Sequence, residues 1–267
     1  MMAQMAKHTF AIFEKEIKLD LRYKVSFFLS SIITPILSFA VVFVVYHGFF
    51  SSGGSNVSEV TRGNYTAFLL IGALTYTVFN TSVNAFHLRF LAEKWWLTIN
   101  AMMIAPVSRF SIIFGVGAAQ MVRSLSGVLL IFLLAYLFHP VSPATVALVT
   151  LILFLIACGC LGFGLVRGVF AISNEDALVF FDYFVMGWVF LSCFHYPKSI
   201  IPPILDPLVI LNPVYHGVTL MRILWFGGSS PHLFLHWLAI ILFAIISPIV
   251  GVIAFNFIWN RMGSEGY

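Results

Sequence analysis

Long apolar runs separated by short polar connectors repeat along the 267 residues of the chain. A helix needs about 20 apolar residues to cross the hydrocarbon core of a bilayer, and six runs reach that length. Hydropathy places them at or within 25–46, 65–86, 111–138, 144–166, 177–194 and 233–259. Pro35 and Pro248 lie inside the first and last runs, and we expect a kink at Pro35. The pattern predicts an all-α integral membrane protein with six transmembrane helices.

Composition agrees with this class and excludes others. Hydrophobic residues make up 61% of the chain and charged residues only 9%, whereas about a quarter of a soluble domain is charged. The three cysteines all lie in apolar runs, so neither a disulfide framework nor a zinc pattern is visible. His232 and His236 have helical metal-ligand spacing, but two ligands do not complete a site. No phosphate-binding loop or nucleophile–base set is present, so we expect no enzyme, no cofactor of its own and no nucleic-acid partner.

The basic residues are distributed unequally between the two sets of connectors. One set holds Lys7, Lys15, Lys18, Arg22, Lys24, Arg89, Lys94, Arg109, Arg167 and Arg261. The other set holds only Arg62, Lys198 and Arg222. Because Lys and Arg concentrate on the cytoplasmic side of membrane proteins, this bias predicts that both termini are cytoplasmic.

Residues 1–24, before the first span, have the pattern of an amphipathic helix. Apolar side chains recur at steps of three and four residues, at Ala6, Phe10, Phe13, Ile17 and Leu21. Glu14–Lys18 and Asp20–Lys24 have the favourable i,i+4 order for ion pairs. We expect a helix that lies on the inner leaflet. The pattern leaves open whether this helix also contacts a cytosolic protein.

The segment 196–228, between spans five and six, is broken by Pro197, Pro202, Pro203, Pro207 and Pro213. Each proline removes a backbone donor and clashes with the preceding turn, so no continuous helix can run through. The apolar pieces 204–211 and 214–226 are each too short to cross. With both termini on one side, this segment cannot cross once. It therefore predicts a re-entrant helical hairpin entered from the outer face, with a loop on the membrane surface as the alternative.

Two ionisable residues, Arg123 and Asp182, lie inside predicted spans at comparable depth. Charges in this position are costly and are usually paired or functional. Arg123 either extends toward the inner interface or pairs with Asp182, and the sequence leaves both open. In span four, Cys160, Gly164 and Gly168 form a small-residue stripe that favours close helix packing.

The connector after span two is too apolar for a solvated loop. Leu91, Trp95, Ile99 and Met102 fall on one helical face, and Pro106 ends the helix. Taken alone, the pattern fits a helix that docks in a protein groove. It also fits a helix half-sunk in the inner leaflet with its tryptophans at the interface.

The order of these parts resembles the membrane subunits of type 2 ATP-binding-cassette exporters, over nearly the whole chain. The most specific pieces are EKWWLTINAMMIAPVSR, from Glu93 to Arg109, and NPVYHGVTLMR, from Asn212 to Arg222. The second piece is most similar to exporters of lipo-oligosaccharides and, more distantly, to daunorubicin-type exporters.

The resemblance implies a role for each part. Residues 25–267 would form the six-helix transmembrane domain, in the inner membrane of a prokaryote. A coupling helix over about 91–106 would dock on a separate ATPase subunit, present in two copies, which binds ATP and Mg. The coupling residues implied are Leu91, Glu93, Trp95, Trp96, Ile99, Met102, Pro106 and Arg109. The chain would form a homodimer among membrane lipids. The re-entrant gate would consist of Pro202, Pro203, Pro207, Asn212, Pro213, Tyr215, His216 and Arg222.

The substrate is the least constrained part of the hypothesis. The resemblance favours export of a lipid-linked or amphipathic glycan, such as an oligosaccharide, polysaccharide or glycolipid. Efflux of hydrophobic drugs or lipids is the alternative within transport. An intramembrane enzyme or an assembly anchor is disfavoured because the spans contain no nucleophile–base or metal set.

Overall fold

The computed structural model describes residues 2–173 and 175–264, and helices dominate that part of the chain. The helices are α1 (Met2–Arg22), α2 (Lys24–Phe28), α3 (Thr34–Ser51), α4 (Tyr65–Trp95), α5 (Ile99–Ile104), α6 (Arg109–Phe138), α7 (Pro143–Ser173), α8 (Glu175–Leu191), α9 (Asp206–Leu211), α10 (Pro213–Phe226) and α11 (Leu233–Ser264). The predicted all-α class is confirmed.

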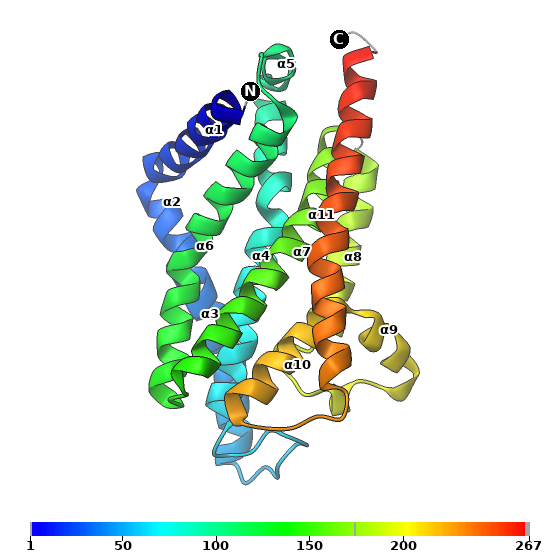
Figure 1. Ribbon diagram of the computed structural model, residues 1–267. Helices are drawn as coiled ribbons and strands as arrows, with labels where there is room; N and C mark the ends of the chain where they lie inside the picture. The colour runs from blue at the N-terminus through cyan, green and yellow to red at the C-terminus, as the bar shows by residue number, and fades with distance from the viewer. Residues whose placement is uncertain (1, 174, 265–267) are drawn as a thin grey trace.

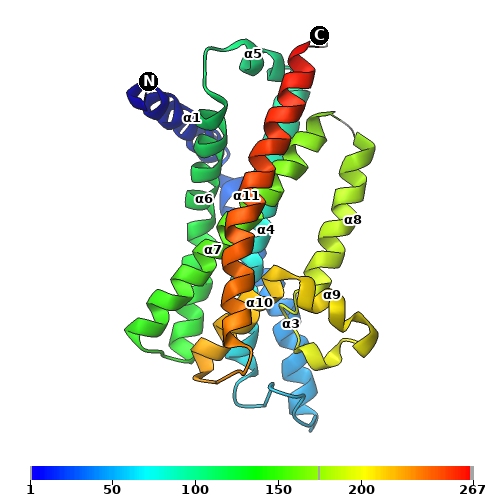
Figure 2. The ribbon, with the colours of Figure 1, turned by 45° about the vertical axis from the view of Figure 1, so that its right-hand side comes forward.

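Helices α3, α4, α6, α7, α8 and α11 run along the long axis of the molecule (Figures 1 and 2). Both termini, α1 and α5 lie at one end, which we call the terminal end. Helices α9 and α10 lie in the half of the molecule at the opposite end, which we call the far end. The short helices therefore form two separate groups, with α1 and α5 at the terminal end and α9 and α10 toward the far end.

Within the described residues, five helices are long and apolar enough to cross a membrane: Lys24–Ser51, α4, α6, α7 and α11. The pair Pro203–Leu211 and Pro213–Phe226 would be a sixth if it were one span, but it is bent by 90°. Helix α8, at the position of predicted span five, has 17 residues and is about 26 Å long at 1.5 Å per residue. The depth of the bent pair in a bilayer remains a prediction.

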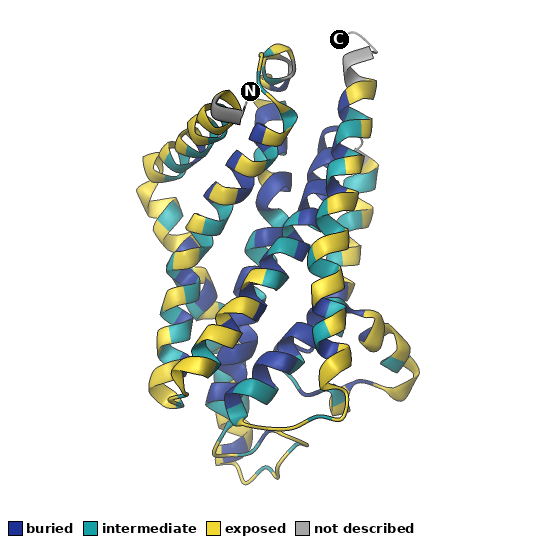
Figure 3. Cartoon of the chain, viewed as in Figure 1, coloured by how far each residue is buried: buried dark blue, intermediate teal, exposed yellow. Residues whose placement is uncertain are grey.

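Helices α4 and α7 form the centre of the bundle (Figure 3). In α4, 78% of the apolar stretch is buried, against 11% in the first span. The predicted stripe of α7 is a site of close packing, because a Cβ atom at Gly164 would lie 2.6 Å from the Ser82 carbonyl oxygen of α4. Another face of α7 meets α11, where Gly162 lies against Pro248. Backbone contact at glycines thus joins the three central helices.

The first span has an irregular turn near Pro35, and the kink expected at this proline remains a prediction. A π-helical turn, Leu29–Ile33, lies between α2 and α3, directly before the proline. Proline cannot donate the backbone hydrogen bond of an α-helical turn, so the turn that precedes it is free to widen. The carbonyl of Ser31 in this turn packs against Gly127 of α6. The span Lys24–Ser51 is therefore one helical segment with a widened turn directly before Pro35.

The prolines of the segment 196–228 begin helices rather than interrupt them. Pro207 and Pro213 occupy the first turns of α9 and α10, where a missing N–H costs nothing. The side chain of Asn212 caps α10 by accepting from the backbone N–H of Val214 at 2.9 Å. The Asn212 side chain also accepts from the Trp188 indole of α8 at 2.6 Å. The cap thus fixes the start of α10 to the end of α8.

The fold predicts opposite accessibility for its two ends. In a background without the native cysteines, Ser55→Cys and Ser229→Cys at the far end should react with an impermeant thiol reagent from one side of the membrane. Lys7→Cys in α1 should react only from the other side. The measurement is labelling of intact cells against inside-out vesicles. Labelling of Lys7→Cys from the same side as Ser55→Cys would contradict a crossing by the first span, and labelling of Ser55→Cys and Ser229→Cys from opposite sides would contradict an even number of crossings between them.

Candidate functional site

A cluster of charged residues joins α1 to the bundle at the terminal end. The Arg89 Nε atom of α4 lies 2.9 Å from Glu16 Oε2, and its Nη2 donates to Asp20. Arg123 of α6 lies 3.5 Å from Asp20 and donates to Ser30 Oγ at 3.2 Å. Burial raises the pKa of Glu16, and the positive charge of Arg89 opposes that effect. We call Lys15, Glu16, Asp20, Arg89, Glu93 and Arg123 the charged junction.

Glu93, in the last turn of α4, is the buried end of this junction. Lys15 of α1 donates to its Oε1, and the Thr98 hydroxyl donates to its Oε2. Both carboxylate oxygens are therefore occupied by groups from outside α4. Glu93 links α1 to the turn that follows α4.

That turn has a Schellman geometry without the usual glycine. The Leu97 N–H bonds to the Lys94 carbonyl at 3.1 Å, and the Thr98 N–H bonds to the Glu93 carbonyl at 3.0 Å. Leu97 occupies the left-handed position, with φ 57°. This conformation costs a non-glycine residue roughly 1–2 kcal/mol. Hydrogen bonds from Thr98 to Glu93 hold it in place.

The expected continuous coupling helix over 91–106 is wrong. Helix α4 continues to Trp95, and the strained turn separates it from the six-residue α5. Leu91, Trp95, Ile99 and Met102 therefore do not share one helical face. Ile99 is buried against Phe90, Ile112 and Phe255, and Met102 packs on the same cluster. The hydropathy pattern gave no sign of the break because it contains neither glycine nor proline.

The break exposes a different set of apolar residues. Trp95 is 72% exposed, Leu97 83% and Ile104 86%, with Trp96 beside them. We call these four residues the apolar knuckle. The chain that follows the knuckle is also held in place. Ala105 is extended before Pro106, and the Arg109 guanidinium donates to Asn256 of α11 at 3.4 Å.

The predictions for α1 are met in part. The i,i+4 pair Glu14–Lys18 forms at 2.6 Å. The pair Asp20–Lys24 is wrong, because Asp20 turns to Arg89 and Arg123 instead. In the apolar stripe, Phe10 and Leu21 are exposed, whereas Phe13 and Ile17 are half-buried. Placement of this face on a leaflet remains a prediction.

Of the two alternatives left open for Arg123, the ion pair with Asp182 does not form. Asp182 of α8 accepts from Arg167 of α7, whose other Nη donates to Asn84 of α4. The Asn84 amide in turn donates to the Asn80 carbonyl at 2.8 Å. Arg167 is buried, whereas the Asp182 side chain is half-exposed. Sequence reasoning missed this polar strip because Arg167 was assigned to a connector, whereas α7 continues to Ser173.

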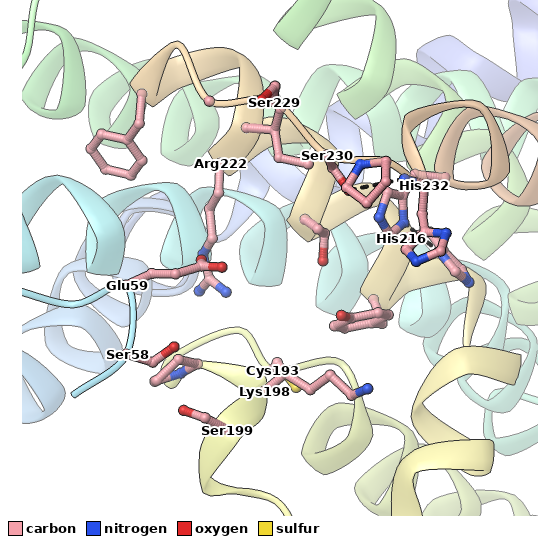
Figure 4. Close-up of a pocket in the computed structure, with 18 of the residues that line it drawn as sticks. Ser58, Glu59, Cys193, Lys198, Ser199, His216, Arg222, Ser229, Ser230 and His232 are labelled. Atoms are coloured by element: carbon pink, nitrogen blue, oxygen red, sulfur yellow. Dashed lines mark hydrogen bonds between the residues drawn. The ribbon is translucent and has the colours of Figure 1, made fainter.

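At the far end, three residues of the expected gate line one pocket of about 700 Å³: Tyr215, His216 and Arg222 (Figure 4). Pro202, Pro203, Pro207, Asn212 and Pro213 shape the helices around it instead. The His216 Nδ1 lies 2.6 Å from His236 Nδ1. In the part of the chain that the structure describes, no group of three or more His, Cys, Asp or Glu could hold a metal ion.

Comparison with known proteins gives the arrangement a family. The model of the ABC-2 type transporter family matches residues 7–226. The chain belongs to this family. It is 23% identical over 212 residues to the inner membrane transport permease YadH of Escherichia coli K12, covering 79% of this chain and 80% of the relative. The permease of the same name in Shigella flexneri matches equally. Family members are permeases without an ATPase domain of their own and work with an ATP-binding subunit.

The charged junction predicts unequal effects for two lysines of α1. Lys15→Met leaves the buried Glu93 carboxylate without its cation, so the unfolding free energy should fall by about 1–3 kcal/mol, between exposed and buried ion pairs. Lys18→Met breaks only the exposed pair with Glu14 and should cost less than about 0.5 kcal/mol. Thermal unfolding of the detergent-solubilised protein measures both. Equal small effects would mean that the junction does not hold α1.

Proposed function

We propose that this chain is the transmembrane subunit of an ATP-driven exporter, and that the apolar knuckle is its contact with the ATPase. The observation that carries the proposal is the exposure of Trp95, Trp96, Leu97 and Ile104 on a frame that charged and apolar contacts hold rigid. Exposed aromatic and aliphatic residues on a pre-ordered frame are typical anchors of protein interfaces.

The strained turn supports docking on a protein over immersion in lipid. A tryptophan at a membrane interface needs no fixed backbone geometry, because lipid adapts to it. Leu97 is nevertheless held in the left-handed region by the bonds between Glu93 and Thr98. Strain of this kind persists where surrounding contacts fix a geometry, and it concentrates at binding sites. A partner with a shaped groove benefits from such a fixed projection.

The knuckle has direct routes into the bundle. Ile99 and Met102 seat α5 against α4, α6 and α11, and Glu93 connects the turn to α1. When the ATPase subunits close on ATP, they would push the knuckle. Because core side chains are close-packed, the push would move these helices as a unit rather than bend α5 alone.

We base the proposed orientation on the distribution of Lys and Arg, and the proposed assembly on the exposure of Asp182. The Lys and Arg bias supports a cytoplasmic terminal end in the inner membrane, the location that the name of the E. coli relative gives for that protein. Asp182 lies about 10 Å along α8 from its start, at 1.5 Å per residue, yet its side chain is half-exposed. A carboxylate facing lipid at that depth is costly. We place α8 at the contact of two copies of the chain, where Asp182 faces a transport path.

We further propose a lipid-linked or amphipathic glycan as the substrate, moved from the cytoplasmic side outward. The polar strip Asn80, Asn84, Arg167 and Asp182 offers hydrogen bonds inside the membrane region, which a purely hydrophobic drug does not use. The likeness of residues 212–222 to lipo-oligosaccharide exporters supports the same class. Efflux of hydrophobic drugs or lipids is the alternative.

The coupling proposal predicts that stability and activity separate at Leu97. Leu97→Gly relieves the left-handed strain, so the melting temperature should stay equal or rise. The variant removes a side chain that contacts the ATPase, so co-purification of the ATPase and coupled ATP hydrolysis should fall several-fold. Trp95→Ala should have the same functional effect. Pull-down and ATPase assays of the reconstituted complex measure both.

The control for these variants is Leu137→Ala, an exposed leucine in the last turn of α6 at the far end. It should leave ATPase binding unchanged. Normal ATPase binding and coupled hydrolysis in both Leu97→Gly and Trp95→Ala would remove the knuckle from the coupling site.

The substrate proposal predicts selective stimulation. In proteoliposomes, a short lipid-linked oligosaccharide should raise ATP hydrolysis by the complex several-fold, whereas its carrier lipid or a hydrophobic dye should not. Asp182→Asn removes the negative charge of the polar strip and should weaken this stimulation, whereas Tyr183→Phe, at the neighbouring exposed position, should not. Stimulation by the dye and not by the glycan would establish the drug alternative.

A further inference from the structure

The far-end pocket contains a buried arginine that makes no direct ion pair with the described residues, although the Glu59 carboxylate lines the same pocket. Arg222 lines the pocket but is only 7% exposed, and its Nη2 donates to the Phe194 carbonyl at 2.6 Å. Its Cζ lies 3.6 Å from the centre of the Phe68 ring. Among the described residues, no carboxylate lies within ion-pair distance of this guanidinium, and its Nε has no hydrogen-bond partner. A buried cation without an anion is costly, so an anion is the ligand chemistry that fits.

The packing around Arg222 is specific. Gly72 lies so close to the Phe194 carbonyl that an added Cβ would be 1.7 Å from its oxygen and 3.2 Å from Arg222 Nη2. The absence of a side chain at Gly72 therefore lets the carbonyl approach and orient the guanidinium. The packing of Gly72 against the Phe194 carbonyl therefore fixes the position of the Arg222 guanidinium.

The histidine pair beside the pocket needs no ligand of its own. His216 Nε2 lies 2.8 Å from the Ile210 carbonyl, which can only accept, so the imidazole must donate from Nε2. In neutral His216 the Nδ1 then accepts from the Nδ1–H of His236. The pair is complete as a hydrogen-bonded unit, and His216 also lines a second hollow beside the pocket.

That second hollow is an apolar groove of about 600 Å³. It adjoins the pocket, because Ile210, His216 and Leu235 line both. Its length follows α11 from Leu235 to Val250, about 22 Å at 1.5 Å per residue. This is close to half of a bilayer roughly 40–45 Å thick including its headgroups. A polar pocket with a buried cation thus lies beside an apolar groove about as long as one leaflet is deep.

We propose that the pocket and groove together bind one phospholipid of the outer leaflet, with its phosphate at Arg222 and an acyl chain along α11. The site does not rest on the proposed coupling or on the exported substrate. Glu59 and the ion pair of Lys198 with Asp206 at 3.2 Å also line or border the pocket. Because Glu59 attracts the ammonium group that phosphatidylethanolamine carries and phosphatidylglycerol lacks, phosphatidylethanolamine binds in preference to phosphatidylglycerol.

The experiment uses the full chain purified in detergent without the ATPase. Added phosphatidylethanolamine should raise its melting temperature, more than phosphatidylglycerol does. Diacylglycerol, which lacks the phosphate, and inorganic phosphate, which lacks the chains, should each have at most a small effect. Native mass spectrometry should show one retained phospholipid per chain. Equal stabilisation by phosphatidylethanolamine and diacylglycerol would overturn the role of Arg222, and full stabilisation by inorganic phosphate would overturn the role of the groove.

A matched pair of variants tests the groove. Leu238 and Ile241 are both 40% exposed on α11, but only Leu238 lines the groove. Leu238→Trp should reduce lipid retention and the thermal shift several-fold, whereas Ile241→Trp should change neither. Identical behaviour of the two variants would overturn the proposal. A change of oligomeric state in Leu238→Trp alone would instead assign the groove to a second copy of the chain.

Two headgroup variants complete the test. Glu59→Gln, on the exposed outer loop, should remove the preference for phosphatidylethanolamine over phosphatidylglycerol. Arg222→Lys keeps the charge but loses the planar fork, so phospholipid binding should weaken while the protein still folds. An unchanged headgroup preference in Glu59→Gln would contradict the ammonium contact. Since no arm uses ATP hydrolysis, failure here leaves the coupling proposal untouched.

Discussion

Two acidic residues of α1, packed against Arg89, hold the terminal end of this protein together. Glu16 and Asp20 are removed from water by α4 and α6, which makes their charges costly unless a cation is near. Arg89 of α4 pairs with both carboxylates, and Glu93 of α4 accepts a hydrogen bond from Lys15 of α1. The N-terminal helix is therefore fastened to the bundle by charge at a boundary where apolar packing alone would let it slide along the membrane surface.

The bundle to which α1 is attached has a tightly packed centre and a more exposed periphery. Helices α4, α7 and α11 meet at glycines, so their backbones touch and leave little room for relative motion. The first span and α8 are largely exposed on their outer sides. A displacement at the terminal end is thus carried by the central helices, while the peripheral helices are free to change neighbours.

Hydropathy and charge predicted the helices, the all-α class and the small-residue stripe of α7, because those features follow from local apolar length and residue size. They did not predict the break after Trp95, because Leu97 adopts a conformation that its own propensity disfavours and that only bonds to Glu93 stabilise. They could not decide whether Arg123 pairs with Asp182, because equal depth does not reveal which helices are neighbours. Arg167 was assigned to a connector because α7 continues to Ser173, beyond the end of its apolar run.

The π-helical turn before Pro35 is the place where the first span bends most easily. A widened turn holds one more residue per loop than its neighbours, and a proline follows it, so bending there strains few hydrogen bonds. A tilt of α1 relative to α3 is therefore easiest at residues 29–33. The first span can keep its contacts with lipid or with a neighbouring subunit while the helix attached to it tilts.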